Sequence, residues 1–314
     1  MEKLLTVIVP VYNDEVNISR CLDSLFNQTF TDMEIIVVND ASTDGTRAVL
    51  NSYQKNHQFQ VINMEKNAGA GCCRNAGMLE SRTPYITFID SDDWIDISTY
   101  SRCFEQIGNN PDVIIFGLVY DYIKNNRREE KYHYSRVYKM PGEFALNIYA
   151  HTIPNEISIT PIVNNKIYRK KFLLENNIFF YKELRYQEDD VFTFEVLARA
   201  SSVVFVNGCN YHYCQRDSSL IHNISELSIH SFITAYRILE SSLRSHDLFS
   251  KFEKAYYLKF KGSLVGVIKR ILDYEPNIEK RNILISLLFV LLIENFDLPK
   301  IVDTFDFTAI RSIM

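Results

Sequence analysis

The chain has 314 residues, 46% of them hydrophobic and 23% charged, which are the proportions of an ordinary globular protein. Its formal net charge of −5 argues against a nucleic-acid-binding protein, which needs a basic face. The six cysteines form no Cys-x-x-Cys pair and indicate neither a disulfide framework nor a zinc site. A strand pattern begins almost at once, so we expect no signal peptide and a reduced, cytoplasmic protein.

The first 118 residues alternate buried strands with helices. Apolar runs predict strands at 4–11, 34–39, 61–63, 85–89 and 113–118. Helices are predicted at 18–26, in a segment ending near Tyr53, and at 70–81; the first has apolar residues at i, i+3, i+4 and i+7. Strands that alternate with helices need crossover connections, so we expect an α/β fold with a mostly parallel sheet.

The pattern changes in the second half of the chain. It weakens between about 120 and 165, where the charge run at 127–131 indicates a solvated loop or a hairpin edge. A helix at 188–200 and a strand at 203–206 follow, and beyond about 222 only helices are predicted, at 227–243, 252–271 and 283–293. This predicts a domain boundary near 220, between an α/β domain at 1–220 and a helical region at 221–314. The last apolar run is too short to span a membrane, which takes about 20 residues, so we expect a buried helix.

Polar residues follow three of the predicted strands, as Tyr12-Asn13-Asp14, Asn39-Asp40 and Asp90-Ser91-Asp92-Asp93. Ligands of parallel sheets lie beyond the carboxyl ends of the strands, so we expect these clusters to share one rim. Closely spaced carboxylates repel each other, and a divalent cation held by oxygen ligands offsets the repulsion. The alternative for these acids, and above all for Asp93, is capping of a following helix.

No glycine-rich phosphate loop follows the first strand. Neither Gly-x-Gly-x-x-Gly nor Gly-x-x-x-x-Gly-Lys-Ser/Thr is present there, which argues against a dinucleotide-binding Rossmann site and a P-loop. A nucleotidyltransferase would also need such a loop, where this chain has Pro10-Val11-Tyr12-Asn13. The acidic rim, with Arg74 on the intervening helix, indicates instead a nucleotide site in which a cation neutralises the diphosphate.

Six motifs in order resemble family 2 glycosyltransferases, the large inverting group with the GT-A fold. The resemblance covers about residues 4–220, and its one departure is Cys72-Cys73, where small residues are usual. The motifs are Val9-Pro10-Val11-Tyr12-Asn13, the segment 39–46, Asn67-Ala68-Gly69 with Arg74-Asn75-Ala76-Gly77, Asp90-Ser91-Asp92-Asp93, Asn165-Lys166-Ile167-Tyr168, and Glu188-Asp189-Asp190-Val191-Phe192.

The resemblance implies metal-dependent transfer of a sugar, with inversion, from a nucleotide-diphosphate donor to an acceptor hydroxyl in polysaccharide or glycoconjugate synthesis. It implies Mn²⁺ or Mg²⁺ on Asp92, with Asp90 toward the ribose or as a second metal contact and His212 as a further metal candidate. An inverting reaction needs a general base, and the resemblance implies Asp189, supported by Glu188. Because three acids are consecutive, the base is assigned only to within one residue.

The nucleotide is expected at the rim. A carboxylate at Asp40 would accept the N3–H of uracil, which cytosine lacks, so a UDP-sugar is favoured. The other residues expected to contact the nucleotide-sugar are Pro10, Tyr12, Asn13, Asn67, Arg74, Asp90, Ser91 and Arg216. The last of these lies in a segment that resembles a lid, in which Arg216 or His212 would close over the diphosphate.

The acceptor and the role of the helical region stay open. A glycan, a lipid-linked and a peptide acceptor all fit. The C-terminal helices would bind the acceptor, pair two subunits, or contact an anionic membrane at the cytoplasmic face through their lysines; the plainer alternative is a solvated helix face. A non-catalytic sugar-nucleotide-binding or scaffold subunit is the rival function. The intact acids at Asp40, Asp90, Asp92, Glu188 and Asp189 argue against it.

Overall fold

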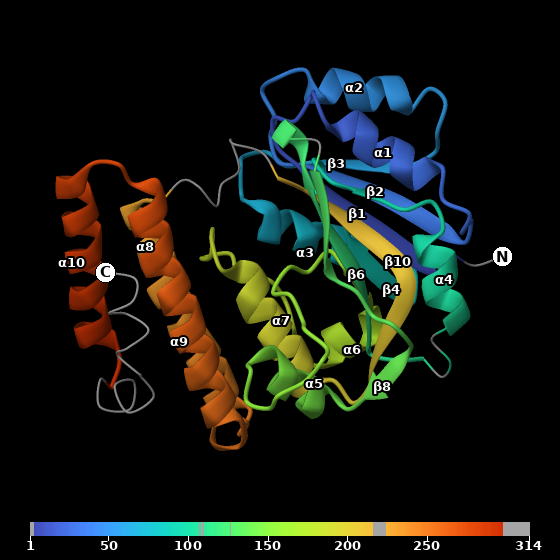
Figure 1. Ribbon diagram of the computed structural model, residues 1–314. Coiled ribbons are helices and arrows are strands. Elements are labelled where there is room, and N and C mark those ends of the chain that lie inside the picture. The colour runs from blue at the N-terminus through green and yellow to red at the C-terminus, as the bar shows by residue number, and fades with distance from the viewer. Residues whose placement is uncertain (1–2, 107, 109, 126, 216–223, 298–314) are drawn as a thin grey trace.

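A computed structural model describes the chain apart from residues 1–2, 107, 109, 126, 216–223 and 298–314. Its ten strands form one twisted sheet in the order β3-β2-β1-β4-β9-β6-β10-β5, with β7 on β6 and β8 on β10 (Figure 1). The strands are β1 (Leu5–Val11), β2 (Met33–Asn39), β3 (Gln60–Asn63), β4 (Tyr85–Phe88), β5 (Trp94–Ile95), β6 (Val113–Tyr122), β7 (Arg127–Tyr132), β8 (Tyr138–Met140), β9 (Lys166–Arg169) and β10 (Val203–Gln215).

Helices cover both faces of the sheet. Side chains alternate along a strand, so Val7 and Val9 of β1 join one apolar core and Ile8 joins the other. Residues of α1, α2 and α4 complete the first core, and residues of α3, α5, α6 and α7 complete the second. The helices are α1 (Ile18–Phe26), α2 (Thr46–Tyr53), α3 (Ala70–Glu80), α4 (Thr99–Gln106), α5 (Gly142–Tyr149), α6 (Lys170–Glu175) and α7 (Glu188–Arg199).

The predicted rim is confirmed. Strands β3, β2, β1 and β4 run parallel, and their register pairs Val11 with Asn39 and Ile8 with Phe88. The three polar clusters that follow β1, β2 and β4 therefore lie at one edge of the sheet. The other half of the sheet is mixed, because β9 runs antiparallel to both β4 and β6, whereas β10 runs parallel to β6.

Three long helices follow the sheet and pack outside α5 and α7 (Figure 1). They are α8 (Glu226–Ser245), α9 (Phe249–Tyr274) and α10 (Ile278–Asn295), and all three were predicted. Ser225 caps α8 by accepting the backbone N–H of Ser228, and Asn277 caps α10 in the same way through Lys280. The domain division at residue 220 falls in a segment outside the described residues and stays a prediction.

The prediction of a buried helix at 283–293 was wrong. Leu284, Leu288 and Leu292 are buried, but Ile283 is 57% exposed and Ile293 is 62% exposed. The apolar run covers the whole circumference of α10, whereas only one face of the helix meets α8 and α9. None of the helices in the described part of the chain is both long and apolar enough to cross a membrane.

The segment at 120–165, where the pattern weakens, contains structure that periodicity missed. Its charge run forms β7, an edge strand paired only with β6, which fits the hairpin-edge alternative. Helix α5 and strand β8 also lie here. The described side chains of β7 and β8 are not buried, so these strands leave little periodic signal, and α5 is short, with eight residues.

Candidate active site

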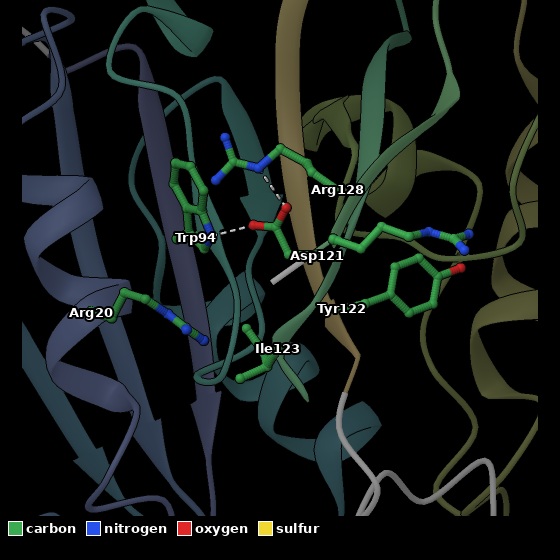
Figure 2. A pocket seen from close by; sticks show the side chains of 7 residues that line it. Arg20, Trp94, Asp121, Tyr122, Ile123 and Arg128 are labelled. Carbon is green, nitrogen blue, oxygen red and sulfur yellow. Dashed lines mark hydrogen bonds and ion pairs between the residues drawn. The ribbon is translucent and has the colours of Figure 1, made fainter. Parts of the chain in front are cut away.

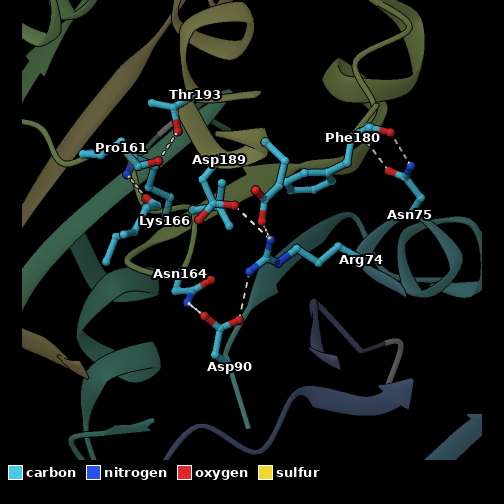
Figure 3. A network of polar contacts seen from close by, with 12 residues as sticks. Arg74, Asn75, Asp90, Pro161, Asn164, Lys166, Phe180, Asp189 and Thr193 are labelled. Atoms are coloured by element: carbon cyan, nitrogen blue, oxygen red, sulfur yellow. Dashed lines mark hydrogen bonds and ion pairs between the residues drawn. The ribbon is translucent and has the colours of Figure 1, made fainter. Parts of the chain in front are cut away.

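Arg74 lies at the centre of the candidate site (Figure 3). Its side chain comes from α3 and is 3% exposed. Nη2 donates to Oδ1 of Asp90 over 2.9 Å, and Nη1 donates to Oδ1 of Asp189 over 2.8 Å. Nη1 also lies 3.5 Å from Oε1 of Glu188. One buried cation thus joins the strand-end acid to the two acids that were predicted for catalysis, and it is held by these acids and not by an open nucleotide pocket.

Asp90 is fastened on its other side by Asn164. The Asn164 amide donates to Oδ2 of Asp90 over 2.8 Å and to the hydroxyl of Tyr211 over 2.9 Å. The Tyr211 hydroxyl in turn accepts the backbone N–H of Asp90. Sequence reasoning missed Asn164, although it directly precedes the Asn165-Lys166 motif. It is a loop residue, and loops carry no periodic signal.

Glu188 and Asp189 occupy the first turn of α7. The residue before them, Gln187, has a φ of 66°, a left-handed conformation that is uncommon for a non-glycine residue. Such backbone strain persists only where the surroundings enforce it, and it gathers at functional sites. The helix N-terminus also favours negative charge at both carboxylates.

Burial and Arg74 shift the pKa values of these two acids in opposite directions. Burial and the neighbouring Asp189 raise the pKa of Glu188 to about 7, although Arg74 lowers it. Burial also raises the pKa of Asp189, with Asp90 adding to the rise and Arg74 opposing it. A carboxyl whose pKa is raised toward neutrality is suited to general-base catalysis.

Lys166 is a fully buried lysine beside this network. Its Nζ donates to the carbonyl of Thr160 over 2.9 Å, to the carbonyl of Ile162, and to Oδ1 of Asn165 over 3.0 Å. It holds the loop that presents Asn164 to Asp90. Burial lowers the pKa of Lys166 to about 7, against the opposing effect of Asp189.

Asp40 is buried at the end of β2, and both its oxygens are already hydrogen-bonded. They accept the backbone N–H groups of Ala68 over 2.7 Å and Gly69 over 2.8 Å. An ionised carboxylate offers about four acceptor positions, so two remain for a ligand. The next residue, Ala41, has a φ of 60°, which places a second strained residue at the rim.

Tyr12 and Asn13 follow β1 and are both exposed. Tyr12 is 49% exposed and does not pack in the core. The Asn13 side chain accepts the backbone N–H of Thr43 over 2.7 Å, and its own N–H donates to Ser42. Asn13 therefore shapes the turn after β2, and Tyr12 is left available to a planar ligand at the rim.

Three other residues predicted for nucleotide binding have structural partners. Pro10 is buried within β1. The Ser91 hydroxyl donates to Oδ2 of Asp14 over 2.6 Å, which links the β1 loop to the acidic cluster. Asn67 accepts from Arg185 through its side chain over 2.9 Å and through its backbone carbonyl over 3.2 Å. Arg185 was not singled out by sequence reasoning, because it lies in a loop.

Asp93 is a structural residue, and the prediction that it caps a helix was wrong. The chain continues from it into β5, and the next helix begins only at Thr99. Its buried carboxyl accepts the backbone N–H of Cys214 over 2.8 Å and contacts the Tyr211 hydroxyl. Burial, followed by repulsion from Asp92 and Asp90, raises the pKa of Asp93 well above its ordinary value.

The residues present fit a metal that the nucleotide helps to bind. Asp90 and Asp92 supply hard oxygen donors, and Asp92 is partly exposed. In the described part of the chain no group of three or more His, Cys, Asp or Glu side chains is arranged to hold a metal. Mn²⁺ or Mg²⁺ bound here would need further ligands. Mg²⁺ commonly takes one or two carboxylates together with substrate phosphates.

His212 does not have a nitrogen free for a metal. Nδ1 lies 3.2 Å from Oδ2 of Asp121 and Nε2 lies 3.0 Å from Oδ1 of Asp96. The ring stacks on Trp94 with 3.5 Å between centroids, and the guanidinium of Arg128 lies over the same indole at 5.4 Å. His212 is therefore not proposed as a metal ligand.

A cavity of about 520 Å³ opens beside this stack (Figure 2). Asp121 anchors its wall by accepting from Trp94 Nε1 and Arg128 Nε, each over 2.9 Å. The Arg20 guanidinium reaches in from α1 and donates to the backbone carbonyl of Asp92. The cavity therefore borders the predicted metal position. Arg216, the remaining predicted contact, lies outside the described residues.

Asp190, the third consecutive acid, faces away from Arg74 and ties α7 to the C-terminal helices. It accepts from the hydroxyls of Tyr149 on α5, of Tyr236 on α8 at 3.0 Å and of Ser263 on α9 at 3.1 Å. Lys259 Nζ lies 2.9 Å from its Oδ1. With these four partners Asp190 serves as a structural anchor, which leaves Asp189 and Glu188 as the acids that face the rim.

The chain is similar in sequence and fold to known proteins. The model of the family described as "Glycosyl transferase family 2" matches residues 6–172. "Putative glycosyltransferase EpsH" of Bacillus subtilis is 29% identical over 253 residues, 80% of this chain and 72% of its own. "Poly(ribitol-phosphate) beta-N-acetylglucosaminyltransferase TarS" of Staphylococcus aureus is 28% identical over 77% of this chain, which spans 41% of that protein. The crystal structure of S. aureus TarS 1-349 in complex with UDP-GlcNAc superposes with a TM-score of 0.63 at 25% identity, covering 86% of this chain and 80% of that one.

Proposed function

The chain belongs to glycosyl transferase family 2, and from this premise we propose that it transfers a sugar from a UDP-sugar to an acceptor hydroxyl with inversion, in polysaccharide or glycoconjugate synthesis. The observation that carries the proposal is the bridge that Arg74 makes between Asp90 and Asp189. It brings the strand end that would hold the donor and the helix turn that would hold the base into one site.

Uridine is favoured by the rim at β1 and β2. The buried Asp40 carboxylate keeps acceptor positions that would take the N3–H of uracil. The exposed Tyr12 ring stands at the neighbouring strand end, where it would stack on the base. The likeness to the TarS structure, which contains UDP-GlcNAc, supports the same donor class.

The proposed reaction divides the work between two sides of the site. Asp189 takes the proton from the acceptor hydroxyl while that oxygen forms a bond to the anomeric carbon. The bond from the anomeric carbon to the diphosphate breaks on the opposite face, and the nucleoside diphosphate leaves with the electron pair. Arg74 holds the Asp189 carboxylate in place and lowers its pKa, against the rise caused by burial, and it also holds Glu188.

Asp92 and Asp90 would hold Mn²⁺ or Mg²⁺ together with the donor phosphates. When bound, the cation would stabilise the negative charge that develops on the leaving diphosphate. Asp90 also fixes the positions of Arg74 and Asn164 by accepting a hydrogen bond from each.

A donor screen tests the proposal. The melting temperature of the protein is measured with UDP-, GDP- and CDP-sugars, each with and without Mn²⁺, because a ligand that binds only the folded state raises it. We expect a rise with a UDP-sugar that grows with Mn²⁺, and release of UDP when an acceptor is added. A response to a GDP-sugar alone would overturn the use of Asp40. UDP-sugar binding without turnover on any glycan, lipid-linked or peptide acceptor would favour the scaffold alternative.

A further inference from the structure

A second cleft lies on the other side of the first turn of α7. It has a volume of about 470 Å³. One wall is formed by Pro161, Gln187 and Asp190, and the other by one face of α9 between Lys259 and Tyr274. Helix α9 packs against α5, and Lys259 fastens it to Asp190. We call this space the α9 cleft. The catalytic mechanism proposed above does not use it.

The α9 cleft carries unpaired positive charge. Lys259 is neutralised by Asp190, but Lys269 and Arg270 also line the cleft. Among the described residues neither of them has an ion-pair partner, and Asp273 is the only other acid in the lining. Burial lowers the pKa of Arg270, which shows that its guanidinium is partly desolvated without a carboxylate to compensate. Such an arrangement favours an anionic ligand.

Gly266 leaves room for a ligand in the cleft. It lies in the interior of the 26-residue helix α9, where glycine costs about 1 kcal/mol relative to alanine. A Cβ at Gly266 would meet no atom within 4 Å, so close packing does not require the glycine. It lines the cleft, and the missing side chain keeps the floor of the cleft open between Ser263 and Arg270.

One wall of the cleft, formed by Pro161, Gln187 and Asp190, adjoins the proposed active site. Gln187 and Asp190 flank the two acids that face Arg74. Pro161 lies in the loop whose other end, Asn164, contacts Asp90 (Figure 3). A chain that occupied the cleft would therefore run beside the turn that carries the base, on the side opposite the donor rim. An acceptor has to pass close to this turn, because its hydroxyl must reach Asp189.

We propose that the α9 cleft binds an anionic acceptor glycan, whose phosphate or carboxylate groups pair with Lys269 and Arg270. The inference rests on the proposed function, since it names the class of acceptor for the same site. A polymer chain fits better than a membrane surface, because the half-buried Arg270 lines a cleft whose opposite wall includes Gln187 and Asp190, beside the turn of the proposed base.

Direct binding tests the proposal without relying on turnover. Fluorescein-labelled poly(ribitol phosphate), hyaluronan and neutral dextran are titrated with the whole protein, and anisotropy is recorded. We expect binding to one or both anionic chains, weakening with salt, and none to dextran. Binding of poly(ribitol phosphate) alone would indicate recognition of phosphate, and binding of hyaluronan alone would indicate recognition of carboxylate.

The variants are chosen in matched pairs on α9. Lys269→Ala with Arg270→Ala should weaken binding by about tenfold, the size expected for losing hydrogen bonds to charged groups. Lys251→Ala with Lys254→Ala removes the same charge from the same helix outside the cleft, and should change binding less than twofold. Equal losses in the two double variants, or no loss in the first, would overturn the proposal.

The two helix glycines supply a steric control. Gly266→Leu fills the cleft and should abolish binding of the anionic chain, whereas Gly262→Leu, at a position that is equally open but outside the cleft, should not. Both variants should keep the melting-temperature response to the UDP-sugar, which shows that they fold. If the unaltered protein shows no melting-temperature response to the UDP-sugar, the result counts against the proposed function and not against the cleft. Binding of phosphatidylglycerol vesicles with the same dependence on Lys269 and Arg270, without binding of either chain, would replace the glycan with a membrane surface.

Discussion

Nη1 of Arg74 lies 2.8 Å from Oδ1 of Asp189, across 115 residues of sequence. The contact sets the position of the carboxylate and opposes the rise in its pKa that burial causes. Removing the charge should therefore show itself in the pH dependence of the reaction.

Arg74→Met should move the acidic limb of the pH–rate profile to higher pH. The base acts unprotonated, and without Arg74 the pKa of Asp189 rises further, so activity is lost more at pH 6 than at pH 8.5. The measurement is kcat/KM against pH, with Arg74→Lys as the control that keeps the charge. A fall by the same factor at every pH would contradict the electrostatic role.

Asp189→Asn should lower kcat by about 10²- to 10⁴-fold, the usual contribution of a general base, while donor binding persists. Steady-state turnover gives kcat, and the UDP-sugar melting shift reports donor binding. Glu188→Gln is the companion variant and should cost less. If Glu188→Gln is the more damaged of the two, the base is assigned one residue too late.

Asp92→Asn should raise the Mn²⁺ concentration needed for half-maximal turnover by about tenfold or more, because one of the few protein ligands loses its charge. Chelation of the unaltered protein should abolish activity, and added Mn²⁺ should restore it. Full activity of the chelated protein would show that the reaction needs no metal.

Tyr236→Phe should destabilise the protein by about 1–2 kcal/mol, because the Asp190 carboxylate loses a donor in a buried site. Tyr256→Phe is a matched control, since its hydroxyl is also buried but bonds to the Tyr236 carbonyl and Glu240, not to Asp190. Denaturant unfolding gives the stabilities. We also expect kcat to fall in Tyr236→Phe alone. Of these two tyrosines, only Tyr236 donates to Asp190, which lies in the helix turn that carries the proposed base. Equal kcat in the two variants would contradict the positioning role of Asp190.

Lys166 should make stability rise with pH above neutrality. Its folded pKa is about 7, whereas an unfolded lysine stays protonated to about pH 10.4, so in this window the unfolded chain binds more protons. The free energy of unfolding should then rise by up to about 1.4 kcal/mol per pH unit between these values. Lys166→Met should flatten the curve, and an unchanged slope would show that other groups cause it.

Sequence reasoning located the rim but not the contacts that complete it. The strand-end acids Asp40 and Asp90 were predictable, because parallel strands end at one edge and their apolar runs are easily read. The bridge from Arg74 to Asp189 was not predictable, since it depends on how α3 and α7 pack. Asn164 was missed for a related reason, because its loop carries no periodic signal, and the hydrogen bond from Ser91 to Asp14 was not predictable although Asp14 was expected at the rim.

The prediction for Asp93 failed for a local reason. An acid after a strand commonly caps a helix, but here the chain enters β5, and the carboxyl turns inward to Tyr211. The α10 prediction failed because an apolar run does not reveal how many of its faces find a partner. Ile283 and Ile293 remain exposed although the run around them reads as core.

The contacts of Asp190 affect the order in which the parts of the site form while the chain is synthesised on the ribosome. Two of its partners, Tyr236 and Ser263, follow it by 46 and 73 residues. The sheet and its donor rim emerge first, whereas the turn that carries the proposed base gains the last of its Asp190 contacts only once α9 has left the exit tunnel. A nascent chain can thus acquire the means to hold a nucleotide before it can use one, and catalytic competence arrives with the last third of synthesis.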